Sequence, residues 1–301
     1  MLFNTKGDKI INTTLTVLLA LFLVVELYPL YFVLIASISD PYLVSTNQIT
    51  FWPRGINFEG YANVLGNEGI WLGYANSLIY TVAGTAINLL LTLSCAFCMA
   101  RQPAFKGKGL IMAILVFTMY FGGGLIPYYL LIRDLDMIDK RMVMIIPGAL
   151  SVFNMIVVRT FYQSTIPQSL YESARIDGSG DFGMFLRITL PLSMPIIAVM
   201  ALFFAVGHWN SYFNALIFLP SPEKQPLQLV LRRILILNQS LAEMSMNNKT
   251  TEELKDLVRR QALAESIKYA VIYIASLPVL IAYPFVQKYF VQGIMIGAIK
   301  G

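Results

Sequence analysis

Long apolar stretches alternate with short polar ones along this chain, and six of the apolar stretches are long enough to cross a bilayer. A transmembrane helix needs about 20 mostly apolar residues to span the hydrocarbon core. The six predicted spans lie at about residues 11–38, 76–99, 109–132, 142–161, 192–219 and 267–290. We therefore expect an all-α fold, a polytopic membrane helix bundle of about six transmembrane helices, with residues 1–301 forming a single transmembrane domain.

The first apolar stretch, residues 11–38, is longer than the core of a signal peptide, which has about 7–15 residues. It shows no convincing cleavage site, so we expect it to be retained as a span.

The distribution of basic residues predicts which loops face the cytoplasm. Arg101, Lys106 and Lys108 stand together after the second span without an acidic neighbour, and an excess of lysine and arginine in a short loop marks the cytoplasmic side. With six spans, both termini and the loop at residues 162–191 are then cytoplasmic. The expected extracytoplasmic loops are residues 39–75 and 220–266. The second of these carries bases as well as acids, and its role stays open.

The composition fits a membrane protein. The chain is 57% hydrophobic and only 13% charged, whereas soluble domains carry about 25% charged residues. Its net charge of +5 is best explained by lysines and arginines at membrane faces, because no basic cluster with interleaved aromatics indicates a nucleic-acid partner. Cys95 and Cys98 lie in an apolar stretch without a second ligand pair, so we interpret them as small apolar residues rather than a metal site.

One polar stretch, Tyr171–Pro191, cannot lie in the hydrocarbon core. Each charged side chain there would cost at least about 2.5–3.5 kcal/mol. The stretch carries five of them: Glu172, Arg175, Asp177, Asp181 and Arg187. It is therefore a loop at the membrane surface.

The start of this loop has the signals of a folded helix. Thr165 and Gln168 have the spacing of a capping box, and Pro167 suits a first helical turn. Leu170 and Ala174 then give the helix a small apolar face.

The middle of the loop has the signals of a turn. Gly178 can end the helix in a left-handed conformation, and Ser179 or Asp181 can cap a second short helix after it. A capped helix kept in a surface loop suggests a docking site for a partner.

The loop resembles the EAA loop of binding-protein-dependent ABC importers, whose pattern is E-A-A, three residues, G, nine residues and I-x-L-P. Ser173 stands in place of an alanine, which exchanges one small residue for another. The matching residues are Glu172-Ser173-Ala174, Gly178 and Ile188-Thr189-Leu190-Pro191.

Other segments resemble the smaller permease subunit of maltose-type oligosaccharide importers. They are the tail Gly293–Gly301, Trp209-Asn210 in the fifth span and Leu277-Pro278 in the sixth. Taken together, the resemblance covers nearly the whole chain.

This resemblance implies a coupling role for the loop. Pro167–Asp177 would be a coupling helix seated in a cleft of a cytoplasmic ATPase subunit, with Glu172 making a polar contact there. The residues implied in coupling are Glu172, Ser173, Ala174, Asp177, Gly178, Leu190 and Pro191. The tail would reach the ATPase through Gly293, Gly297, Lys300 and Gly301.

The resemblance also implies the partners. They are a cytoplasmic ABC ATPase dimer, a second, homologous permease that forms a heterodimer with this chain, an extracytoplasmic solute-binding protein, a glycan substrate and the bilayer of a bacterial plasma membrane. The sequence has no phosphate-binding loop of the G-x-x-x-x-G-K-[ST] kind. We therefore expect no cofactor on this chain and assign ATP and Mg to the ATPase, whose closure would drive alternating access of the pore.

Two groups of polar residues lie within predicted spans. Glu26 in the first span is either a functional carboxylate or a structural hydrogen-bonding group. In the fifth span, amides and an aromatic ring are suited to a sugar path, but interhelical hydrogen bonding is an equal alternative. There, Asn210 and Asn214 are expected one turn apart on one helix face. The candidate path residues are Glu26, His208, Trp209, Asn210 and Asn214.

Other function classes fit less well. An importer of amino acids, polyamines or phosphate would share the EAA loop but not the sugar-type tail. A membrane enzyme needs a cluster of titratable or metal-binding residues at one face, and the single histidine and the carboxylate of Glu26 do not form one. We thus expect no catalytic and no metal-binding residues. A channel would leave the folded loop unexplained.

Overall fold

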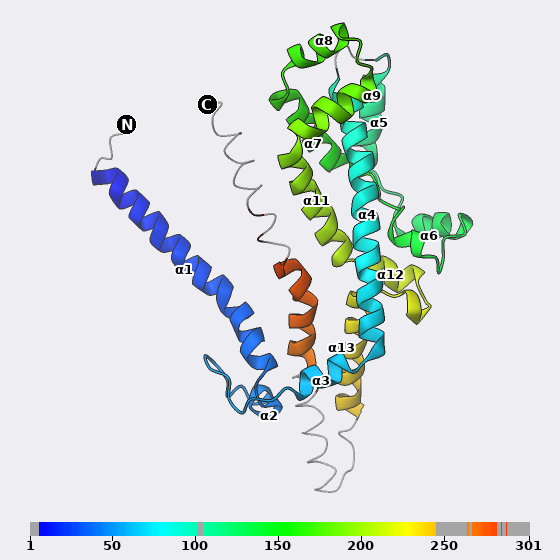
Figure 1. Ribbon diagram of the computed structural model, residues 1–301. Coiled ribbons are helices and arrows are strands. Elements are labelled where there is room, and N and C mark those ends of the chain that lie inside the picture. Colours follow the sequence, from blue (N-terminus) through cyan, green and yellow to red (C-terminus); the bar gives the residue numbers. More distant parts are fainter. Residues whose placement is uncertain are drawn as a thin grey trace, which may run out of the picture. The chain divides into compact units, whose positions relative to one another are not determined.

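The computed structural model describes residues 6–101, 105–244, 264, 267–281, 284 and 287. All regular elements within these residues are helices, which confirms the predicted all-α fold (Figure 1). The chain divides into two compact units, residues 1–70 with 231–277 and residues 71–230 with 278–301.

The first unit begins with a long helix, α1 (Lys6–Ser37), followed by α2 (Pro41–Ser45) and α3 (Glu59–Leu65). An apolar helix at Ile267–Ile281 lies mostly in this unit. Helix α4 (Glu68–Ala100) starts in the first unit and continues through the second.

The second unit holds the remaining elements, which are mostly shorter. In chain order they are α5 (Lys108–Tyr120), α6 (Leu125–Asp134), the 3-10 helix η1 (Arg141–Met144), α7 (Val152–Thr165), α8 (Gln168–Ile176), α9 (Asp181–Met184), the π-helix η2 (Phe185–Thr189), α10 (Leu190–Leu192), α11 (Met194–Trp209), α12 (Phe213–Phe218), the 3-10 helix η3 (Pro222–Lys224) and α13 (Leu227–Met244), which continues into the first unit.

The first unit is held together near the end of α1. Ile35 and Ala36 pack there against Val44 of α2 and Ile49 of the following loop, and all four residues are buried. The rest of α1 is almost entirely exposed although it is strongly apolar. A helix that is apolar all round is typical of a membrane span.

The second unit has two apolar cores along α4. The core near the end of α4 gathers Phe97, Met155 of α7, Met184 of α9 and Phe204 of α11. The core near the beginning of α4 is built by Tyr80, Ile132, Val143, Phe218 and Leu229, among others. The first of these cores supports the polar loop that the sequence singles out.

Among the described residues, two helices are long and apolar enough to cross a membrane, or up to four if each of two bent pairs counts as one span. The two single helices are α1 and α4, which overlap the predicted spans 11–38 and 76–99. The predicted span 142–161 contains η1, a turn and the helix α7, and the end of 267–290 lies largely outside the described residues. The count of six spans, and with it the domain and loop boundaries, stays a prediction.

The two bent pairs have identifiable causes. Helices α5 and α6 meet at 115° across the glycines at 122–124, where Gly124 has φ +83°, a conformation that glycine adopts without strain. The segment Asp181–Leu192 and α11 meet at 83° around Ser193, and Pro195 has no backbone N–H to continue the helical bonding across this point.

Candidate functional site

The polar loop contains a short amphipathic helix, α8. Its cap residues are Pro167 and Asp177, so the predicted helix Pro167–Asp177 agrees with the observed bounds. Tyr171 and Ala174 face the core at the end of α4, whereas Glu172 and Ser173 are exposed. Helix α8 thus turns a polar face outward, and its opposite face packs against the core at the end of α4.

An apolar side chain also lies on the outward surface of α8. Ile176 at the end of the helix is 87% exposed, and Leu170 at its beginning is exposed as well. Only Ala174 of the predicted pair Leu170 and Ala174 therefore packs against the core. Exposed apolar groups beside carboxylate and hydroxyl groups are suited to contact with a protein partner.

The predicted capping residues of the loop are wrong. Thr165 is the last residue of α7, and the N-cap of α8 is Pro167, which has no side-chain oxygen to offer the first N–H groups. Likewise, Gly180 and not Ser179 or Asp181 caps α9. The link between α7 and α8 is too short for Thr165 to act as a cap.

The predicted left-handed turn at Gly178 is confirmed. Its φ is +79°, and the Ser179 N–H reaches back to the Ala174 carbonyl at 2.8 Å, which closes the helix end. A Cβ at this position would meet no atom within 4 Å, so the backbone conformation and not the available space calls for glycine.

A buried hydroxyl pair fastens α8 to the second half of the loop. The Tyr171 hydroxyl lies 2.9 Å from Thr189 Oγ1, which is fully buried in η2 and also donates to the Met184 carbonyl. Burial raises the pKa of Tyr171, and the hydrogen bond to Thr189 partly opposes this rise. The ring of Tyr171 is 6.3 Å from that of Phe97 on α4. Helix α8 is thereby joined to η2, and π-helical turns are frequent at functional sites.

The end of α4 is bound both to α9 in the loop and to α7, the helix before the loop. Arg101 forms an ion pair with Asp181 in the first turn of α9. The carbonyls of Met99 and Ala100, which have no partner within α4, accept hydrogen bonds from Arg159 (3.0 Å) and Gln163 (3.4 Å) of α7. The end of α4 is therefore joined directly to α7 and α9.

A hollow of about 290 Å³ lies beside α8, between the ends of α4 and α7. Aromatic, aliphatic and polar side chains line it. The lining residues are Phe97, Ala100, Arg101, Tyr162, Gln163, Ile166, Gln168 and Tyr171.

The remaining predicted coupling residues have different settings. Leu190 is half-buried against the core that supports α8, and Pro191 is exposed in α10. The predicted tail residues, Gly293, Gly297, Lys300 and Gly301, lie outside the described residues.

The polar residues of the fifth predicted span do not form one cluster. His208 Nε2 lies 3.2 Å from Asn88 Oδ1 of α4, and the ring of the buried Trp209 packs edge-on against Tyr74 at 5.5 Å. The Asn210 side chain donates to the Val206 carbonyl at 3.0 Å, within its own helix.

The prediction that Asn210 and Asn214 share one helix face is wrong. Helix α11 ends at Trp209, and residues 210–212 separate it from α12, so Asn210 lies outside both helices while Asn214 lies in α12. Glu26 is exposed on α1, in the other unit. Within the second unit, His208, Trp209 and Asn210 thus have separate partners and form no common polar site among the described residues.

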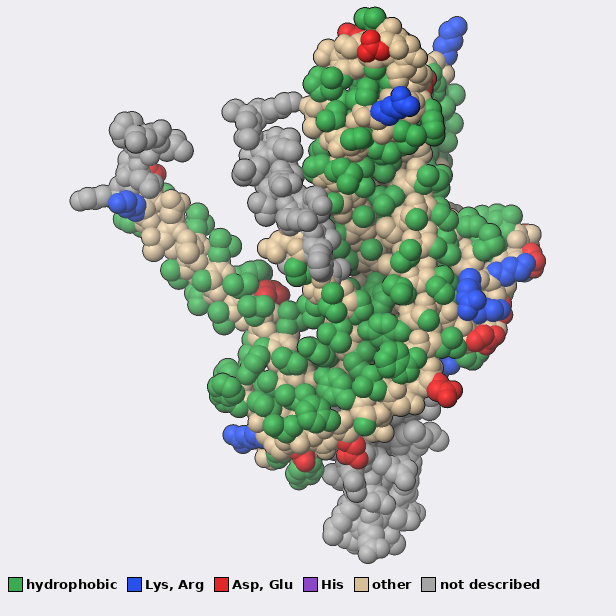
Figure 2. Space-filling view, in the orientation of Figure 1, with side chains coloured by type: hydrophobic (Ala, Val, Ile, Leu, Met, Phe, Trp, Pro, Cys, Tyr) green, Lys and Arg blue, Asp and Glu red, His purple; other side chains and the backbone are tan. Residues whose placement is uncertain are grey.

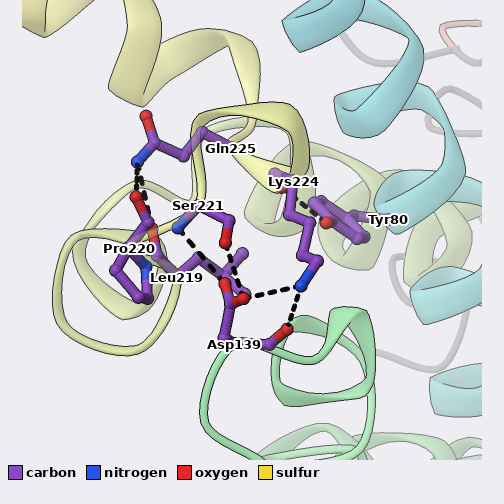
Figure 3. A network of polar contacts seen from close by, with 7 residues as sticks. All are labelled: Tyr80, Asp139, Leu219, Pro220, Ser221, Lys224 and Gln225. Carbon is purple, nitrogen blue, oxygen red and sulfur yellow. Dashed lines mark hydrogen bonds and ion pairs between the residues drawn. The ribbon is translucent and has the colours of Figure 1, made fainter.

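A second polar network was not predicted; it ties two loops near the start of α4 (Figure 3). Asp139 accepts from Lys224 Nζ at 2.6 Å and from the Ser221 hydroxyl at 2.6 Å, and the Tyr80 hydroxyl donates to the Lys224 carbonyl at 2.6 Å. The hydrogen bonds from Lys224 and Ser221 hold the pKa of Asp139 below its usual value. More than 80 residues separate Asp139 from its partners, so no local pattern could have paired them.

Comparison with known proteins gives consistent relatives over the whole length, although no family model matches the chain. The chain is 35% identical over 300 residues to protein LplC of Bacillus subtilis, which covers 99% of this chain and 97% of LplC. It is also 35% identical over 287 residues to the polygalacturonan/rhamnogalacturonan transport system permease protein YtcP of the same organism, covering 94% and 96% of the two chains.

A solved structure has the same fold. It is a bacterial ABC transporter involved in the import of the acidic polysaccharide alginate, and it matches with a TM-score of 0.82 and 33% sequence identity. The match covers 96% of this chain and 100% of the other.

Proposed function

Because this chain belongs to the permease family of carbohydrate ABC importers, we propose that it moves an oligosaccharide or a related glycan inward as one transmembrane subunit of such an importer. The observation that carries this proposal is a likeness in both sequence and fold over nearly the whole chain. The relatives are permeases, so the chain is a membrane-integral transport subunit and not an enzyme.

In this proposal α8 is the element that receives force from a separate ATPase. Glu172 and Ser173 are exposed for the contact, while Tyr171 and Ala174 hold α8 on the core. When an ATPase moves α8, the Tyr171–Thr189 hydrogen bond and the shared core carry the movement to η2 and onward to α11. Rigid elements with two arrangements are what alternating access requires.

The partners in the proposal follow from the family. They are an ATPase dimer that binds ATP and Mg, a second permease and a solute-binding protein. The tail residues Gly293, Gly297, Lys300 and Gly301 are proposed as a further ATPase contact. The proposed setting is a bacterial plasma membrane, with both termini in the cytoplasm.

The substrate class in the proposal is a glycan, and acidic glycans are the first to test. One relative is named for polygalacturonan and rhamnogalacturonan transport, and the transporter of similar structure imports alginate. The contacts of His208 with Asn88 and of Trp209 with Tyr74 favour structural roles for these two residues. Glu26, Asn210 and Asn214 stay as proposed path residues.

The test is ATP hydrolysis by the complex reconstituted in lipid with its candidate ATPase, second permease and binding protein. Oligosaccharides of alginate and polygalacturonan are compared with amino acids and phosphate. We expect the acidic oligosaccharides to stimulate hydrolysis. Stimulation by amino acids or phosphate alone would overturn the glycan assignment, and failure to assemble with any ATPase would overturn the importer assignment.

Variants of the loop test the role of α8 in the same assay. Glu172→Ala removes the exposed carboxylate, and Gly178→Val forces a β-branched residue into a left-handed conformation at a cost of about 1–2 kcal/mol. We expect both to lose stimulated hydrolysis while the complex still assembles. Gly178→Asn is the matched control, because asparagine tolerates this conformation and should keep coupling. Normal coupling in Glu172→Ala and Gly178→Val would exclude the proposed role.

A further inference from the structure

The loop after α1 folds back along that helix instead of leaving it. The Tyr31 hydroxyl donates to the Phe51 carbonyl at 2.5 Å, and the Tyr28 hydroxyl donates to the Thr50 carbonyl at 3.2 Å. The rings of Tyr28 and Phe51 are also in contact, with centroids 5.8 Å apart. The tip of the loop is therefore held beside the C-terminal third of α1.

The base of the loop is closed by backbone hydrogen bonds. The Asp40 N–H donates to the Arg54 carbonyl, and the Asn57 N–H donates to the Ile38 carbonyl, both at 2.9 Å. The Asp40 carboxylate caps α2, and Ile49 is buried on the end of α1. The segment 39–57 is thus a structured loop whose tip points back toward the N-terminal end of α1.

The depth of this tip follows from the length of α1. The span Gly7–Ser37 has 31 residues, or about 46 Å at about 1.5 Å per residue, against a hydrocarbon core of about 30 Å. A centred helix therefore extends roughly 8 Å beyond the hydrocarbon at each end. Tyr31 and Tyr28 stand six and nine residues before Ser37, roughly 9 and 13 Å along the helix. The loop tip thus lies between the boundary of headgroups and acyl chains and a depth of roughly 5 Å on the acyl side.

The side chains of the tip suit that boundary. Phe51 is 63% exposed and Trp52 is 76% exposed, and Ile56 nearby is exposed as well. Tryptophan and other aromatic residues are enriched where hydrocarbon meets water. Figure 2 shows apolar side chains along α1 and over the segment that follows it.

The hydrogen bonds of the tip also suit a region with little water. Non-helical backbone at this depth needs internal partners for its carbonyls. The carbonyls of Thr50 and Phe51 have such partners in the two tyrosine hydroxyls of α1.

We propose that the tip of this loop, Thr50–Trp52, is a lipid-binding wedge seated at the headgroup–acyl boundary of the leaflet at the Ser37 end of α1. The wedge adjoins the exposed apolar surface of α1. This inference rests on the membrane-spanning nature of α1 and not on the identity of the transported solute.

Site-directed spin labelling of the assembled transporter in phosphatidylcholine vesicles tests the wedge. Cys95 and Cys98 are the free cysteines among the described residues, and both are replaced by alanine before Trp52→Cys is labelled with a nitroxide. The control is Asn63→Cys on α3, whose neighbour Tyr61 is bonded to Ser37 at the end of α1 at 2.8 Å. We expect the label at 52 to collide with oxygen more than with a water-soluble nickel complex, and the label at 63 to show the reverse. Equal nickel access at both positions, or protection of position 52 from both reagents, would overturn the proposal.

A second measurement keeps the native cysteines. The fluorescence of Trp52 is taken as the difference between the wild-type chain and Trp52→Phe, in vesicles with and without lipids brominated high on the acyl chain. We expect the brominated lipid to quench the fluorescence of Trp52, so that the wild-type chain and Trp52→Phe differ less than in vesicles without it. An unquenched difference would mean that water or protein, and not lipid, surrounds the side chain.

Discussion

At the scale of single residues, the hydroxyl pair Tyr171–Thr189 joins the two halves of the polar loop, residues 171–191. Tyr171→Phe keeps the ring beside Phe97 and removes only the bond to Thr189. A net hydrogen bond contributes about 0.5–1.5 kcal/mol, so we expect the free energy of unfolding to fall by about 1 kcal/mol. Because the same bond joins α8 to η2, glycan-stimulated ATP hydrolysis should fall as well. Chemical denaturation in detergent and the reconstituted assay measure the two effects.

A double-mutant cycle separates this bond from other effects of the substitution. Thr189→Val removes the second hydroxyl, and the double variant Tyr171→Phe with Thr189→Val removes both. Contacting residues usually show interaction energies of about 0.5–3 kcal/mol. Additive effects of the two substitutions would contradict a direct role of this bond.

At the scale of elements, the network around Asp139 fastens the loop between α6 and η1 to the loop between α12 and η3. Lys224 and Ser221 lower the pKa of Asp139, whereas the unfolded chain should titrate near the usual value of about 3.9. A carboxyl group with a lowered pKa in the folded state stabilises the protein above its unfolded pKa, and this stability is lost as the pH falls through its folded pKa.

The pH dependence of unfolding therefore tests this network. We expect Asp139→Asn to lower the thermal unfolding temperature at neutral pH, because the ion pair with Lys224 is lost. The difference from the wild type should shrink as the pH falls below about 4, where the wild-type carboxylate also becomes protonated. A difference that stays constant down to the lowest pH would show that the charge of Asp139 does not stabilise the loops.

Sequence reasoning located the helix α8 but not what holds it. The bounds Pro167–Asp177 and the turn at Gly178 were predictable because charge, helix periodicity and glycine act locally. The pairings Arg101–Asp181 and Asp139–Lys224 were not, because they join segments 80 and 85 residues apart that only the fold brings together. The break after Trp209 was also missed, since an apolar stretch gives little sign of where a helix within it ends.

At the scale of the whole molecule, α4 connects the features of the second unit. Asn76 and Tyr80 near its beginning bind the loop that contains Lys224, Asn88 binds His208 of α11, and Arg101 just after its end pairs with Asp181. The polar loop 171–191 and the loop that contains Lys224 are therefore connected through one continuous helix, α4. Coupling over such distances requires contiguous, rigid packing.

The close contact between Gly84 of α4 and His208 of α11 gives the last prediction. Gly84 leaves room for the imidazole of His208, and a Cβ at this position would overlap the ring. Gly84→Ala should therefore push α11 away, break the bond between His208 and Asn88 and cost about 1–3 kcal/mol, as overpacking usually does. His208→Ala in the same chain removes the ring that clashes, so the double variant should unfold at a higher temperature than Gly84→Ala alone. Thermal unfolding of the four chains measures this, and a Gly84→Ala variant as stable as the wild type would show that α11 is free to shift along α4.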